Sequence, residues 1–175
     1  MKQISKYIIE KLKLSKNDKI YNYQPQNLKE LKELINKLIK ERGKDADLND
    51  IDTSEITNMS MLFQSSDFNG DISGWDVSNV KSMRAMFVDS QFDRDISNWD
   101  VSKVEDMFSM FNDSKFNKDI SKWNVKNVKS MENMFYGSKF NQDISNWDVS
   151  NVIDIARIFY NCPLEKNPPA WYKNK

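Results

Sequence analysis

The stretch DVSNVKSMRAMFVDSQFDRDISNW, residues 76–99, decides the fold because nearly the same sequence returns 24 residues later, and then again. The copies share a first residue that is aspartate or asparagine, at Asp52, Asp76, Asp100 and Asn124. The copies also share a last residue, at Trp75, Trp99, Trp123 and Trp147. A fixed period of about 20 to 50 residues is typical of arrays whose units stack on their neighbours. The sequence therefore predicts a solenoid, with residues 52–147 as four repeats.

The residues before the array predict an N-terminal cap. Apolar residues follow one helical stripe, at Leu28, Leu31, Leu34, Ile35, Leu38 and Ile39. Asn27 and Glu30 have the spacing of a capping box, and Gly43 offers a left-handed exit. We therefore predict an amphipathic helix over 28–42, within a cap formed by residues 1–51.

The residues after the array form a degenerate fifth repeat. In it, Pro168 and Pro169 replace the isoleucine and serine of the earlier copies. Proline cannot donate a hydrogen bond to a neighbouring strand. Residues 148–175 are therefore predicted to be a C-terminal cap that discourages a further coil or another molecule from pairing there.

The repeat columns separate by chemistry. Within residues 76–99, the spacing of Val80, Met83, Met86 and Phe87 favours a short helix facing the core. The run Ile-Ser-x-Trp-Asp-Val, for example 96–101, is predicted to be a strand that pairs in parallel with its copies. The tryptophan column has two interpretations, an exposed ladder that stacks sugars or bases and a core column. The core interpretation is favoured because Val77, two residues after Trp75, points to the same face.

The same residues resemble a known family. The run Ile72-x-x-Trp75-x-Val77-Ser78, continued by the apolar columns, resembles the leucine-rich repeat of BspA-like bacterial surface proteins. The string FNxDISxWDVSNVxxMxxMF is similar to the repeat of surface lipoproteins of wall-less bacteria and of some viral and protist proteins. The resemblance covers residues 52–171 and implies protein-binding or adhesive roles. We therefore expect the α/β class, as a right-handed leucine-rich-repeat-like solenoid with one parallel strand and one short helix per coil.

Composition excludes several classes of function. Basic and acidic side chains balance at 26 each, so no nucleic-acid partner is expected. No apolar run approaches the roughly 18 residues of a membrane span, so no membrane insertion is expected. Charged residues interrupt the apolar residues of the first 16 positions, which argues against a secretory signal peptide. A cytoplasmic or virion-associated location is therefore favoured over export, despite the usual surface location of the family.

Catalysis is not expected. The chain has no histidine, and its one cysteine, Cys162, replaces a serine in a column near the core. Two acidic ladders run through the repeats, one containing Asp71 and one containing Asp76. Calcium binding is one interpretation of these ladders, but Asx turns are favoured because no calcium-loop motif is present. We therefore predict no catalytic residue, no metal site and no cofactor.

The predicted function is protein binding by a monomer through the solenoid surface. The candidate polar residues are Ser73, Asp76, Ser97, Asn98, Asp100, Ser121, Lys122, Asn124, Ser145 and Asn146. The candidate aromatic residues break the repeat pattern and are Phe108, Tyr136 and Tyr160. A single exposed aromatic residue is normal, so packing adjustment is an equal alternative for these three. The alternative function is a structural or assembly subunit of a virion or surface layer.

Overall fold

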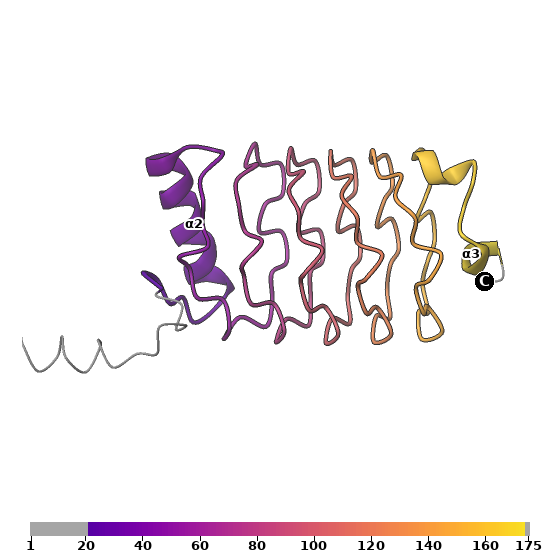
Figure 1. Ribbon diagram of the computed structural model, residues 1–175, viewed down its shortest axis with the longest axis horizontal. Coiled ribbons are helices and arrows are strands. Elements are labelled where there is room, and N and C mark those ends of the chain that lie inside the picture. The colour runs from indigo at the N-terminus through magenta and orange to yellow at the C-terminus, as the bar shows by residue number, and fades with distance from the viewer. Residues whose placement is uncertain (1–20, 174–175) are drawn as a thin grey trace, which may run out of the picture.

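The computed structural model describes residues 21–173, which form a stack of coils with a helix across one end (Figure 1). Its helices are α2 (Leu28–Arg42), the 3-10 helix η1 (Pro163–Glu165) and α3 (Ala170–Lys173). Between α2 and η1 the chain consists of turns and isolated parallel β-bridges. The first 20 residues of the predicted N-terminal cap, and residues 174–175 of the predicted C-terminal cap, lie outside the described residues.

The predicted helix over 28–42 is confirmed as α2. The side chain of Asn27 accepts a hydrogen bond from the N–H of Glu30 at 3.0 Å, and the carboxylate of Glu30 accepts one from the N–H of Gln26 at 2.9 Å. At the other end, Gly43 has φ of 89° and donates its N–H to the carbonyl of Ile39. These contacts satisfy backbone groups that a helix end leaves without partners.

The segment after α2 already takes part in the stack. The carbonyl of Leu48 accepts a hydrogen bond from the indole N–H of Trp75 at 2.9 Å, as isoleucine carbonyls do one coil later. Gly70 is needed at this junction, because a Cβ there would lie 1.9 Å from the carbonyl oxygen of Ala46. Later copies carry a side chain at the same position, as at Arg94. The first junction is therefore tighter than the others.

The prediction of a short helix in each coil is wrong. Phe63 and Phe87 stack with ring centroids 5.5 Å apart, and Phe87 and Phe111 repeat that distance. Packed α-helices need about 8–10 Å between their axes, so the coils are too close to hold a helix each. The backbone hydrogen bonds run instead to the next coil, for example from Met83 N–H to the carbonyl of Asp106 at 2.9 Å.

This packing requires backbone conformations that a helix does not contain. Non-glycine residues with positive φ recur at two positions of the repeat, including Ala85 at 53° and Asp89 at 51°. Left-handed non-glycine residues are unfavourable, so the hydrogen bonds to adjacent coils must hold them in place.

The prediction of one strand per coil is also wrong, and with it the α/β, leucine-rich-repeat-like class, because the described residues form isolated bridges and no sheet. In the segment 96–101, the N–H of Trp99 bonds the carbonyl of Ile96 at 3.1 Å, which closes a turn. Aspartate side chains accept from the backbone on either side of this turn and so compete with a ladder. Single-residue parallel bridges occur in the segment predicted to be helical, at Asn58, Ser82, Asp106, Ser130 and Asp154.

The predicted core is confirmed. Trp75, Trp99, Trp123 and Trp147 are no more than 5% exposed, and each indole N–H bonds a carbonyl of the preceding coil. The methionines and phenylalanines of the repeat columns are buried beside them, as at Met107 and Phe111. The tryptophan column therefore joins the coils and offers no exposed ladder.

Candidate functional site

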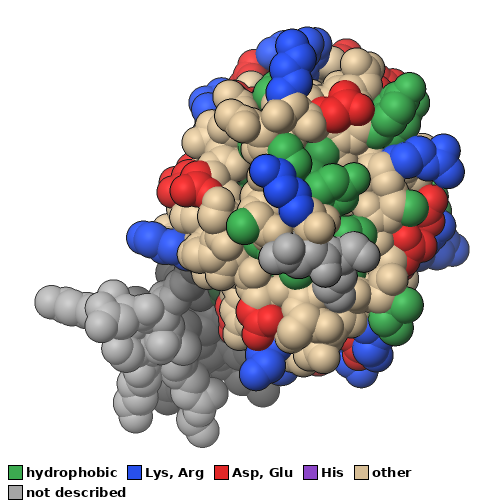
Figure 2. Space-filling model, turned by 90° about the vertical axis from the view of Figure 1, so that its right-hand side faces the viewer, with side chains coloured by type: hydrophobic (Ala, Val, Ile, Leu, Met, Phe, Trp, Pro, Cys, Tyr) green, Lys and Arg blue, Asp and Glu red, His purple; other side chains and the backbone are tan. Residues whose placement is uncertain are grey.

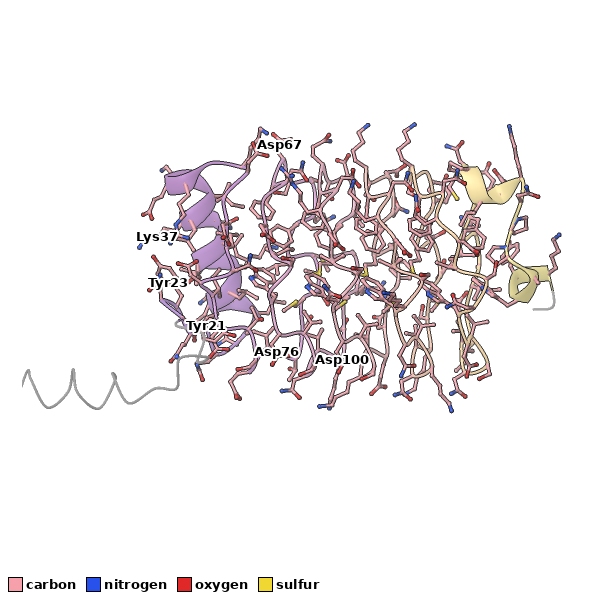
Figure 3. All side chains as sticks on the ribbon, in the orientation of Figure 1. Tyr21, Tyr23, Lys37, Asp67, Asp76 and Asp100 are labelled. Carbon is pink, nitrogen blue, oxygen red and sulfur yellow. The ribbon has the colours of Figure 1, made fainter. Side chains whose placement is uncertain are left out.

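The ten predicted polar residues recur in or next to the turns that join isoleucine and tryptophan in successive coils, and we call this series of turns the turn face. Figure 3 shows Asp76 and Asp100 next to each other along one edge of adjacent coils. Each is the acceptor of an Asx turn, because its carboxylate accepts the N–H of the residue two positions later, Ser78 and Ser102. Asn124 keeps the same turn with its amide oxygen, which accepts from the N–H of Lys126 at 3.3 Å.

The serines of the turn face serve a second set of turns. Their N–H groups donate to carboxylates at 2.8–2.9 Å, in the pairs Ser73–Asp71, Ser97–Asp95, Ser121–Asp119 and Ser145–Asp143. This confirms that the aspartate ladders are turn residues. The aspartate side chains of the turn face therefore use hydrogen-bond acceptors to stabilise the backbone turns.

The turns also perturb the acidity of the aspartates. The backbone N–H of Ser97 lowers the pKa of Asp95 below its ordinary value, and that of Ser121 does the same for Asp119. For Asp100 the largest cause of the lowered pKa is the hydrogen bond from the Ser102 hydroxyl. Hydrogen bonds to a carboxylate favour its charged form, so these groups stay ionised in a stack of like charges.

Open grooves run between the coils of the turn face. One of about 580 Å³ is lined by Asp45, Asp71, Ser73, Asp93, Arg94, Asp95, Asn98 and Lys118. Its opposite charges pair across coils, since Lys118 lies 3.0 Å from Asp93 and Arg94 lies 3.9 Å from Asp45. Among residues 21–173, no three cysteine or carboxylate side chains are grouped to hold a metal ion. This face is a mixed-charge surface rather than an enclosed binding pocket.

The three predicted aromatic residues separate into two places. Phe108 is half-buried and lies under the guanidinium of Arg84, whose central carbon is 3.7 Å from the ring centroid. Tyr136 and Tyr160 stack with their centroids 5.1 Å apart, and Tyr160 is 52% exposed. We call these two rings the tyrosine pair. The structure thus brings two of the three aromatic residues together on the last two coils.

A groove of about 330 Å³ lies between the segments that follow the two tyrosines in the sequence. Its lining comes from the segments that follow each tyrosine and from the C-terminal cap, and consists of Gly137, Ser138, Lys139, Asn161, Cys162, Pro163, Glu165 and Lys166. Within the described residues, neither tyrosine hydroxyl has a hydrogen-bond partner. The pair therefore combines apolar ring surface with polar groups that are available to a partner.

Sequence reasoning missed the exposure of two apolar residues, Met61, which is 43% exposed, and, more strongly, Ile153, which is 85% exposed. Its column otherwise holds Thr57, Lys81, Glu105 and Lys129. An isoleucine in a polar and charged column is a visible signal of an exposed apolar side chain. Ile153 is therefore a surface feature of the last coil alone.

Cys162 is not prepared for nucleophilic chemistry. It is 6% exposed, and burial raises the pKa of its thiol. A thiol needs to become a thiolate to act as a nucleophile, and the chain has no histidine to assist it. The helices of the described residues were also compared with the length and apolar character that a bilayer span requires, and none of them meets both.

A family model described as "Mycoplasma protein of unknown function, DUF285" matches the chain over residues 6–115, 29–137 and 91–171. The first two matches begin 23 residues apart (29 − 6), close to the length of one repeat, as expected for a model that itself spans several repeats. No match was found among curated proteins or among solved structures. The family match supports the resemblance to repeats of wall-less bacteria and gives no finer detail.

Proposed function

We propose that this chain, which belongs to the DUF285 family of Mycoplasma proteins of unknown function, is a non-catalytic protein-binding module. The observation that carries the proposal is the tyrosine pair. Its column holds Gln64, Val88 and Asn112 in the other coils, so the repeat itself does not require aromatic rings there. Tyrosine is enriched among the residues that dominate protein–protein binding energy.

The scaffold supports this use of the pair. The carbonyls of Tyr136 and Tyr160 accept hydrogen bonds from Asp113 at 2.7 Å and from Gly137 at 2.9 Å. Both residues therefore sit on a backbone that is tied to the preceding coil. Rigid aromatic side chains lose little conformational entropy on binding, which favours affinity.

A comparison of captured proteins tests the proposal. The purified chain is immobilised beside a Tyr136→Ser/Tyr160→Asn variant, and each is exposed to a protein extract and to proteins of the surrounding medium. We expect a partner that binds the wild type and whose purified form binds the variant at least about thirtyfold more weakly, as expected for hot-spot residues.

A Gln64→Ser/Asn112→Ser variant is the matched control, because it changes the same column in other coils. It should keep the affinity of the wild type. A partner that binds all three proteins equally would show that the tyrosine pair is not the binding surface.

The alternative function is a structural or assembly subunit that associates through its ends. The position of α2 argues against simple head-to-tail stacking, because Leu31, Ile35 and Leu38 are buried where a further coil would have to pack. Light scattering over a wide concentration range tests it, and a monomer throughout would exclude self-assembly.

A further inference from the structure

Adjacent coils are joined by a fixed pattern of backbone groups. Each coil offers its successor one carbonyl and then N–H groups on alternate residues. Thus Glu105 accepts from Lys129 N–H at 2.8 Å, while Met107 and Ser109 donate to the next coil at 3.0 and 2.9 Å. This pattern repeats at every junction, so it defines which groups a following segment must supply.

The last coil offers the same groups, and within residues 21–173 it is followed by the short helices η1 and α3 in place of a further coil. Ile153 N–H donates to the carbonyl of Lys129 at 2.8 Å, so the segment is correctly paired on its inner side. On its outer side, the carbonyl of Ile153 and the N–H groups of Ile155 and Arg157 have no hydrogen-bond partner among residues 21–173. We call residues 153–157 the open edge.

The rest of the C-terminal end is closed. Glu165 accepts the N–H of Asn161 at 2.9 Å, and Trp171 and Tyr172 pack on the ring of Phe159. The indole N–H of Trp171 also bonds the carbonyl of Ile144 at 2.8 Å, beside the two prolines. The cap therefore covers this end around Asn161, the ring of Phe159 and the carbonyl of Ile144, and leaves the open edge outside these contacts.

The side chains of the open edge are unusually apolar for an unpaired edge. Proteins commonly place charged side chains on such edges to discourage pairing with other chains. The corresponding internal residues Lys81 and Lys129 are charged, whereas Ile153 is 85% exposed. Figure 2 looks onto this end and shows hydrophobic side chains at the surface between charged ones.

A second copy of the chain does not supply the missing partner. The first coil would have to offer the carbonyls of Asn58, Ser60 and Leu62, but α2 lies across that end, where Lys32 donates to the carbonyl of the adjacent Met61 at 3.2 Å. If the C-terminal ends of two copies met, the N–H groups of one open edge would face the N–H groups of the other, and donors cannot pair with donors. These contacts favour a different polypeptide, with a segment free to extend, as the occupant.

We infer that the open edge binds an extended segment of another protein, which pairs in parallel and continues the coil ladder. The segment supplies one N–H to the carbonyl of Ile153 and carbonyls on alternate residues to Ile155 and Arg157. An apolar side chain of the segment covers Ile153. Edge addition of this kind takes its affinity from main-chain hydrogen bonds and its specificity from alternate side chains.

A synthetic peptide tests the inference, because internal coils already show a segment that fits. The probe is an end-capped peptide with the sequence of residues 127–135 and a Lys129→Ile change. We expect saturable binding by fluorescence anisotropy and at least about tenfold slower hydrogen exchange at the amides of Ile155 and Arg157. The same peptide methylated on the backbone nitrogen of position 129 should bind at least about tenfold more weakly.

Two protein variants complete the test. Ile153→Lys restores the internal charge and should weaken binding at least about tenfold. Lys81→Ile/Ile153→Lys has the composition of the wild type but places the exposed isoleucine on a paired coil, and it should bind as weakly as Ile153→Lys. The Tyr136→Ser/Tyr160→Asn variant should bind the peptide like the wild type, because the inference does not depend on the tyrosine pair.

Three results would overturn the inference. The first is no binding of the peptide up to about 1 mM, the weakest affinity worth assigning. The second is binding of the Lys81→Ile/Ile153→Lys variant as tight as that of the wild type, which would indicate adhesion to any exposed isoleucine. The third is concentration-dependent self-association that Ile153→Lys abolishes, which would make a second copy the occupant.

Discussion

The coil of residues 100–123 and the last coil, residues 148–171, share their apolar columns but differ in what surrounds them. In the internal coil, Met107 and its neighbours bond coils on both sides, and Trp123 is 3% exposed. In the last coil, Trp171 is half-buried, and Ile153 and Tyr160 are exposed. The residues of the core columns are constrained because coils pack on both sides of them. In the last coil, residues on the outer side have no further coil to pack against within the described residues.

This difference assigns separate tasks to the repeat and to its end. In a stack, stability is approximately a sum of terms for each coil and for each junction between coils. Internal coils contribute two junctions and little distinctive surface. The last coil contributes one junction. It also carries Tyr160, the more exposed ring of the tyrosine pair, and the open edge, so both proposed binding surfaces involve it.

The largest effect is expected for the tryptophan column. Trp123→Ala removes a buried ring and its hydrogen bond to the carbonyl of Ile96, and should lower the free energy of unfolding by about 3–5 kcal/mol. Trp171→Ala should cost less, because Trp171 is half-buried and faces one coil only. Urea denaturation followed by circular dichroism measures both losses. Equal losses would show that an end coil is held as firmly as an internal one.

A smaller effect is expected for the left-handed residues. Ala85→Val places a β-branched side chain at φ of 53° and should cost about 1–3 kcal/mol of stability. Ala85→Gly should change stability by less than about 1 kcal/mol, because relief of strain and the added freedom of the unfolded chain oppose each other.

Arg157 occupies the same repeat position in the last coil, also with φ of 53°. Its N–H has no partner among the described residues, so the backbone there can relax. Arg157→Val should therefore cost less than Ala85→Val in the same denaturation experiment. A larger loss at Arg157 would contradict the view that the adjacent coils hold this conformation.

The smallest effect concerns acid sensitivity. The folded-state pKa of Asp100 lies below its ordinary value of 3.8, so the charged form stabilises the fold above that pH. This stabilisation is lost as the pH falls through the folded-state pKa. Asp100→Asn keeps an acceptor for the turn but cannot titrate, and should lose less stability than the wild type on acidification from about pH 7 to about pH 3.

Asn124 provides the matched control, since it is the natural asparagine of the same column. Asn124→Asp should make stability more sensitive to acid, as measured by denaturation midpoints at the two pH values. An unchanged acid sensitivity in both variants would show that these turns contribute nothing through their charge.

The core and the first helix were predictable because their signals are local or periodic. The stripe from Leu28 to Ile39 and the cap at Asn27 lie within one segment, and α2 has the predicted bounds. Burial of the tryptophan and methionine columns follows from recurrence at one repeat position. The tyrosine residues were also visible, because they depart from that recurrence.

The conformation of each coil was not predictable in the same way. The spacing of Val80, Met83 and Met86 is the spacing of a helix, and it correctly predicts one buried side. It says nothing about the distance to the next coil. The stacked rings of Phe87 and Phe111 set that distance at 5.5 Å, which leaves no room for a helix in each coil.

The sequence by itself determined the period, the buried columns, the helix α2 and the residues that break the pattern. Only the tertiary structure decided that the coils are built from turns, that Tyr136 and Tyr160 meet, and that the outer side of residues 153–157 has no backbone partner among residues 21–173. The physical reason is that the backbone partners of one coil lie about 24 residues away in the next coil. Local patterns predict which side chains are buried, but they do not contain the spacing or the hydrogen bonds between coils.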